Sequence, residues 1–160
     1  IINILFLVKQ NLLGLPVLYL SRYINQHKSS YYSLLQTTRN TNDWEAWLLF
    51  MLEAVEQTSQ QTTVLIKQIR DLMQHHKIAL RAKLPKIYSQ DLINNLFCHP
   101  YTKIDFVANE LQVSRQTAAR YLDEIVSIGL LSKHKMGKDN YYLNDDLFLL
   151  LSEKKKKNLA

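Results

Sequence analysis

The sequence predicts a mainly α-helical protein with one small β-hairpin near its C-terminal end. Three observations support this fold class. The 160 residues include only 3 Gly and 3 Pro, which leaves little material for β-turns. Apolar residues recur at helical spacing along most of the chain. One stretch, residues 130–143, reads instead as two short strands around a corner that contains Gly137.

A helix–turn–helix pattern precedes this hairpin. The apolar periodicity of residues 104–111 predicts one helix, and Ser114 is a suitable N-cap for a second. The second helix carries a buried stripe and ends at Gly129. Between the two helices Gln112 stands where many such corners have Gly, and a positive φ there costs a non-Gly residue about 1 kcal/mol. Together with a first helix at residues 90–98, capped by Ser89, this order is the winged helix-turn-helix arrangement.

This arrangement suggests DNA binding. A winged module places its second helix in a major groove and its hairpin against the backbone. Gln116 suits adenine and Arg120 suits guanine. The candidate DNA-binding residues are Arg115, Gln116, Thr117 and Arg120 in the groove, with Lys135 and Lys138 on phosphates.

The net charge of the winged module is also compatible with a second function. Residues 87–153 have a net charge of −3, whereas a dedicated duplex binder usually has a basic face. A protein-contact or self-association module, such as a homodimer interface, would also account for the tyrosines expected on its surface: Tyr121, Tyr141 and Tyr142. The sequence therefore supports double-stranded DNA and protein partners about equally.

The first half of the chain is predicted to be helical throughout. Residues 1–11 read as a buried helix, Ser21 as the cap of a short helix, and Asn42 with Glu45 as a capping box. That box opens the longest helical pattern, which Pro85 ends; about 40 residues would extend roughly 60 Å. We divide the chain into residues 1–86, a winged module at 87–152 and a basic disordered tail at 153–160.

Several function classes are disfavoured. The single Cys98 fits a reducing compartment, and without a signal peptide we expect a cytoplasmic protein. No apolar run is long enough for a membrane span. No Cys/His spacing suggests a metal, and the tripeptide His99-Pro100-Tyr101 reads as a helix end, so we assign no metal ligand and no catalytic residue. This chain by itself is not expected to be an enzyme.

Four runs resemble the C-terminal half of Fic-family proteins. They are Ile2-Asn3-Ile4-Leu5-Phe6-Leu7, Leu15-Pro16-Val17-Leu18-Tyr19-Leu20-Ser21-Arg22-Tyr23-Ile24, Lys28-Ser29-Ser30-Tyr31-Tyr32-Ser33-Leu34-Leu35 and Trp44-Glu45-Ala46-Trp47-Leu48-Leu49-Phe50-Met51-Leu52. In that family such helices follow the catalytic loop, and a C-terminal winged helix is common in one large subgroup. The resemblance implies a remnant of a Fic-type helical bundle followed by that domain.

The resemblance also implies an activity for a longer parent protein. Fic proteins transfer AMP from ATP, with Mg²⁺, onto a hydroxyl of a protein substrate, through a His-Pro-Phe-x-x-Gly-Asn-Gly-Arg motif. That motif is absent here, so no catalytic residue is carried over and no cofactor is expected in this fragment. ATP and Mg²⁺ are implied for the full-length protein only. The alternative is a winged-helix transcription regulator or a protein-interaction module.

Overall fold

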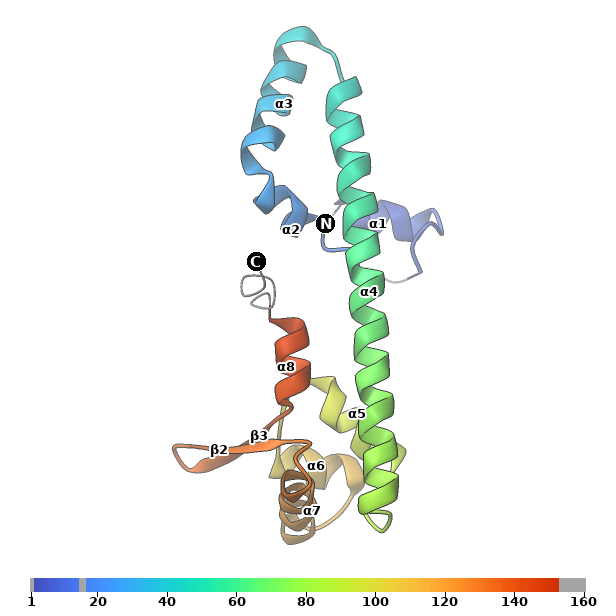
Figure 1. Cartoon of the computed structure of the whole chain (residues 1–160). Coiled ribbons are helices and arrows are strands. Elements are labelled where there is room, and N and C mark those ends of the chain that lie inside the picture. The colour runs from blue at the N-terminus through green and yellow to red at the C-terminus, as the bar shows by residue number, and fades with distance from the viewer. Residues whose placement is uncertain (1, 15–16, 153–160) are drawn as a thin grey trace, which may run out of the picture. The chain divides into compact units, whose positions relative to one another are not determined.

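The computed structural model describes residues 2–14 and 17–152 and is mainly α-helical with one small sheet (Figure 1). Its helices are α1 (Ile2–Lys9), α2 (Leu20–Gln26), α3 (Lys28–Thr41), α4 (Glu45–Lys83), α5 (Gln90–Cys98), α6 (Ile104–Leu111), α7 (Arg115–Ser127) and α8 (Asp145–Leu151). Its strands are β1 (Tyr101–Lys103), β2 (Ser132–Met136) and β3 (Asp139–Leu143). The predicted fold class is confirmed. The predicted basic tail at 153–160 lies outside the described residues.

The chain forms two compact units, Ile1–Ile66 and Lys67–Ala160, which meet inside α4. The sequence-based boundary at 86/87 lies about one turn beyond the end of this helix. The difference has a physical reason: residues 67–83 continue α4 without a breaker, yet Leu80 is fully buried in the core of the second unit. The second half of α4 is therefore part of the second unit.

The first unit has a small core. Among its described residues a buried cluster forms from Leu18, Leu20, Tyr23 and Ala54. The prediction that the first helix is buried was wrong, because Leu5 and Phe6 are 58% and 57% exposed. The apolar residues around this helix indicated that it is buried, but the other elements of the first unit cover only part of its surface.

Two of the predicted helix starts in the first unit were also wrong. Helix α2 begins at Leu20, so Ser21 lies inside it, and no side-chain hydrogen bond caps this helix. Asn42 adopts a left-handed conformation at the end of α3 and does not open α4. The capping acceptor is its neighbour, since Asp43 Oδ1 accepts a hydrogen bond from the Glu45 amide at 3.0 Å.

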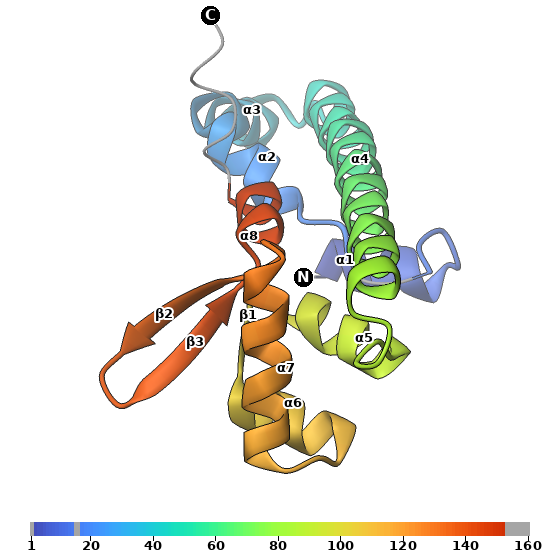
Figure 2. The ribbon, with the colours of Figure 1, turned by 60° about the horizontal axis from the view of Figure 1, so that its bottom comes forward.

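In the second unit, helices α5, α6 and α7 begin and end close to where the sequence predicts, and a three-stranded antiparallel sheet completes the unit (Figure 2). The strand order is β1-β3-β2, with Tyr101 opposite Leu143 and Ser132 opposite the same residue on the other side. The hairpin of β2 and β3 was expected, whereas β1 was not. Strand β1 ties the segment between α5 and α6 to the hairpin.

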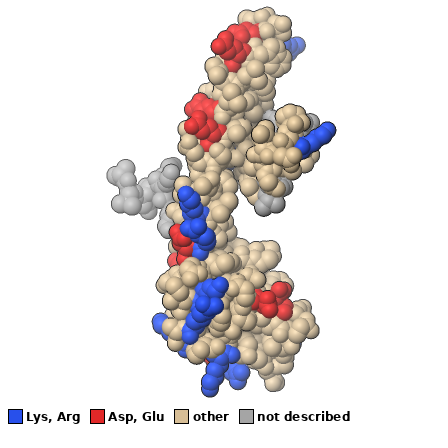
Figure 3. All heavy atoms as spheres, turned by 90° about the vertical axis from the view of Figure 1, so that its right-hand side faces the viewer, with Lys and Arg blue, Asp and Glu red and all other residues tan. Residues whose placement is uncertain are grey.

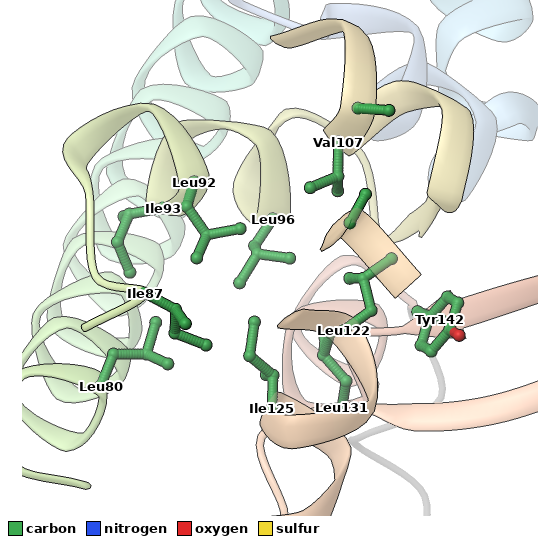
Figure 4. Close-up of a cluster of buried hydrophobic side chains, with 12 residues drawn as sticks. Leu80, Ile87, Leu92, Ile93, Leu96, Val107, Leu122, Ile125, Leu131 and Tyr142 are labelled. Carbon is green, nitrogen blue, oxygen red and sulfur yellow. The ribbon is translucent and has the colours of Figure 1, made fainter. Parts of the chain in front are cut away.

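The core of the second unit is larger, and four helices and strand β3 contribute side chains to it (Figure 4). Fully buried side chains come from α4, α5, α6, α7 and β3, and include Leu80, Leu92, Ile93, Val107, Leu122, Ile125 and Tyr142. The prediction that Tyr142 lies on the surface was wrong, because its ring packs in this core. Leu122 and Ile125 belong to the predicted inward stripe of α7, which is confirmed. This core holds α7 so that its opposite face is exposed to solvent.

The corner between α6 and α7 has the geometry expected from the sequence. Gln112 adopts φ 53° and ψ 42°, in the left-handed region that favours glycine. Its Nε2 donates a hydrogen bond to the Asn109 carbonyl oxygen at 2.6 Å. This local bond offsets part of the conformational cost, so a non-Gly residue forms the corner.

Candidate nucleic-acid interface

The N-terminal half of α7 is ordered by its cap. Ser114 Oγ accepts a hydrogen bond from the Thr117 amide at 3.1 Å, as predicted. The Thr117 hydroxyl lies 2.9 Å from the same Oγ, so Thr117 is engaged within the helix start and is only partly exposed. Arg115, Gln116 and Arg120 are exposed on this helix. Three of the four predicted groove residues of α7 therefore present their side chains to solvent.

Both arginines of α7 have acidic partners. Arg115 forms an ion pair with Asp105 at the start of α6, and both side chains are at least half exposed. The Arg120 Nε lies 3.7 Å from Glu124 one turn further along α7. Exposed pairs of this kind contribute little free energy, so either arginine can exchange its carboxylate for a phosphate at low cost.

The hairpin that follows this helix carries exposed lysines. Lys135 lies on β2 and Lys138 in the turn, where Gly137 supplies a positive φ of 63°. Both predicted phosphate-contacting residues are exposed. The structure thus places all six predicted residues within one unit, on α7 and the adjacent hairpin, as Figure 2 allows the reader to follow.

A link between α7 and the hairpin was not foreseen. Asp123 Oδ1 accepts hydrogen bonds from Lys133 Nζ at 2.8 Å and from the Tyr142 hydroxyl at 3.0 Å. The lysine is the main reason that the pKa of Asp123 lies below its usual value, and the same bond raises the pKa of Lys133. Lys133 therefore balances the negative charge of Asp123. The partners are ten and nineteen residues apart, so no local pattern indicated them.

A row of basic residues on the second half of α4 was also missed as part of this unit. Lys67, Arg70, Lys77 and Arg81 fall within one broad face of the helix, with Gln74 between Arg70 and Lys77. Figure 3 shows Lys and Arg side chains, in blue, following one another down this part of the molecule. Residues 67–86 hold six Lys or Arg and one acidic residue. The sequence-based boundary had assigned this charge to the first domain.

The remaining His, Cys and acidic residues form no metal cluster among the described residues. No group of three His, Cys, Asp or Glu side chains there is close enough to hold a metal ion. His99 ends α5 and Tyr101 begins β1, so the His-Pro-Tyr tripeptide joins a helix to a strand. In the part of the chain that the structure describes, no helix has the length and apolar character of a membrane span.

A comparison with protein families shows which family domain the second unit is similar to. Residues 72–147 match the family model described as the C-terminal domain of SoFic-like protein adenylyltransferases. The chain carries a Fic-family C-terminal domain. The match begins in the second half of α4 and ends in α8, so it includes all three strands and most of the second unit. The predicted relationship to the Fic family is thereby confirmed for a C-terminal fragment, and the four runs quoted from residues 2–52 lie outside the match.

Proposed function

We propose that the second unit is a winged helix-turn-helix module that binds double-stranded DNA through α7 and the β2–β3 hairpin. The observation that carries the proposal is the exposure of Arg115, Gln116 and Arg120 on α7, together with the exposed lysines of the hairpin that follows this helix. The serine cap and the buried stripe of α7 fix these side chains on one rigid element. In the parent Fic protein this module would direct AMP transfer, from ATP with Mg²⁺ onto a protein hydroxyl, to the vicinity of DNA in the cytoplasm.

The test begins with selection of duplexes from a randomised pool, followed by fluorescence anisotropy across a range of salt concentrations. Arg120→Ala should cost roughly 1–3 kcal/mol of discrimination at one base pair. Lys138→Ala should weaken binding to all sequences alike and reduce the salt slope by about 1. Arg39→Ala, an exposed arginine of α3, is the matched control and should change neither quantity. Absence of salt-dependent binding by the wild-type chain would refute the proposal.

The activity assigned to the parent has a separate test. This chain incubated with labelled ATP and Mg²⁺ should transfer no AMP, because the Fic catalytic motif is not in its sequence. Transfer by the chain would overturn the view that it contributes only targeting. The DNA assay does not depend on this outcome.

A second candidate function is protein contact, and an exposed aromatic cluster favours it. Tyr101 and Phe106 are 38% and 41% exposed, and the Tyr101 ring lies 5.7 Å from that of Tyr141. Contiguous exposed aromatic side chains are typical of interaction surfaces. Analytical ultracentrifugation at increasing concentration tests whether the partner is a second copy: a strict monomer would exclude a homodimer.

A further inference from the structure

The C-terminal end of α5, strand β1 and α6 surround an open pocket of about 300 Å³. Each helix presents one face to it, with lining residues at i, i+3 and i+4. The lining residues are Asn95, Cys98 and His99 from α5 and its end, Tyr101 and Thr102 from β1, and Phe106, Asn109 and Glu110 from α6. All of them belong to the second unit.

The walls of this pocket are aromatic. The Tyr101 ring centroid lies 6.1 Å from that of His99 and 6.4 Å from that of Phe106. The planes of Tyr101 and His99 are inclined by only 24°. These rings therefore offer π-faces and edges to a flat group that enters the pocket.

A hydrogen bond orients one polar side chain of the lining, and another side chain carries a negative charge. The Thr102 hydroxyl donates to Asn95 Oδ1 at 2.7 Å, which orients that amide. Glu110 is the one charged side chain among the eight lining residues, and no ion pair in the described part of the chain engages it. The pocket thus combines aromatic walls with an uncompensated carboxylate.

We propose that this pocket binds the guanidinium group of an arginine side chain from a partner protein. A guanidinium is planar, stacks on aromatic rings and donates two parallel hydrogen bonds to a carboxylate. A nucleotide would also stack, but the lining has no cation for its phosphate, and Glu110 would repel that group. The inference sharpens the protein-contact function above and is independent of DNA binding.

The single cysteine of the chain makes the test direct. Cys98 is exposed and lines the pocket, so its rate of modification by a small thiol reagent reports occupancy. The probe is the peptide N-acetyl-Gly-Arg-Gly-amide, and its control is the same peptide with citrulline, which has the same shape but no charge. The arginine peptide should slow the modification as its concentration rises, and the citrulline peptide should not.

Two variants test whether the arginine peptide protects Cys98 by binding in this pocket. Glu110→Gln should weaken protection by about tenfold, the change that accompanies loss of a charge-assisted hydrogen bond. Phe106→Leu keeps an apolar side chain but removes the ring and should weaken it several-fold. Glu124→Gln, the same substitution outside the pocket, should leave it unchanged. Far-UV circular dichroism and the unliganded rate at Cys98 verify that each variant is folded.

Three results would overturn the proposal: equal protection by both peptides, no protection by either, or protection by AMP in place of the arginine peptide. The last would assign the pocket to nucleotides. Measuring duplex binding of Glu110→Gln in parallel separates this inference from the proposed DNA-binding function. Weaker peptide protection of this variant with intact duplex binding supports the pocket and separates it from the DNA interface. In the wild-type chain, absence of peptide protection refutes only the pocket, and absence of duplex binding refutes only the DNA interface.

Discussion

The first unit has a buried cluster of four residues among those described, whereas the second unit buries twelve in one continuous core. Side-chain caps are also more frequent at the helix starts of the second unit. Ser89, Ser114 and Asn144 cap helices of the second unit with side-chain hydrogen bonds, while α2 and α3 of the first unit begin without one. Local sequence signals and tertiary packing agree in the second unit, and such agreement is what makes a segment fold to one structure.

The first unit exposes apolar side chains along both α1 and α4. A groove of about 370 Å³ runs between them, lined by Phe6, Leu7, Leu20, Leu48, Met51, Leu52 and Val55. Exposed apolar surface does not contribute the burial free energy of about 25 cal/mol per Å² that a covered surface gives. We therefore expect the first unit to be the less stable of the two.

The largest expected effect comes from a pair of leucines, one buried in the core of the second unit and one exposed on the first unit. Leu122→Ala removes a fully buried side chain of α7 and should lower the free energy of unfolding of the second unit by about 2–5 kcal/mol. Leu52→Ala, at a position 65% exposed, should change stability by less than about 0.5 kcal/mol. Hydrogen exchange of α7 and β3 amides follows the second unit, and Trp44 and Trp47 fluorescence follows the first. Equal effects of the two substitutions would contradict the comparison.

Helix caps should show the next largest contrast. Asn144 is buried, accepts a hydrogen bond from the Leu147 amide and donates one to the Leu96 carbonyl. Asn144→Ala leaves these groups without partners and should cost about 2 kcal/mol. Asp43→Ala removes the exposed cap of α4 and should cost less, about 0.5–1 kcal/mol. Urea denaturation with the two unit-specific probes measures both; a larger cost at Asp43 would disprove the ranking.

A buried histidine should make the second unit sensitive to acid. His76 is fully buried with its ring edge-on to Phe97, and both ring nitrogens are without a hydrogen-bond partner among the described residues. Burial is the main cause that lowers the pKa of His76, followed by repulsion from His75, while Asp146 opposes the shift.

The sign follows from which state takes up the proton. Below its ordinary pKa of about 6.5, His76 protonates in the unfolded chain but is held neutral in the folded one. Stability should therefore be greatest above pH 6.5 and fall at lower pH, with a slope of at most about 1.4 kcal/mol per pH unit from this group. His76→Leu should abolish most of that slope, and His75→Leu, at an exposed position, should retain it. Denaturation curves between pH 5 and 8 decide between these outcomes.

The smallest effect is expected where the hairpin joins α7. Tyr142→Phe keeps the buried ring but removes the hydroxyl that donates to Asp123, and should cost about 1 kcal/mol. Tyr101→Phe, on an exposed ring, is the matched control and should be neutral. Exchange rates of β2 and β3 amides should rise selectively in the first variant. An unchanged rate would mean that Lys133 alone links Asp123 to the hairpin.

How much of this could be predicted from the sequence depends on the range of the interactions. Helices α5 and α6 were predicted with their observed bounds, because a serine cap, a proline and apolar periodicity are all local signals. Strand β1 was missed because three residues carry no alternation, and their pairing with β3 joins segments about forty residues apart. The candidate interface residues were named from the sequence. The ion pairs with Asp105 and Asp123 were not predicted, because these pairs depend on how the helices and the hairpin pack.

The position of β2 at the edge of the sheet affects how the protein behaves in concentrated solution. Within residues 2–14 and 17–152, strand order β1-β3-β2 leaves one side of β2 without a hydrogen-bonded neighbour, which makes it a template for a strand from another molecule. Lys133 and Lys135 stand along this strand, and their charges oppose approach of an identical edge. A polyanion that neutralises these lysines would remove that protection, so turbidity should be greatest at intermediate polyanion ratios and not in the free protein.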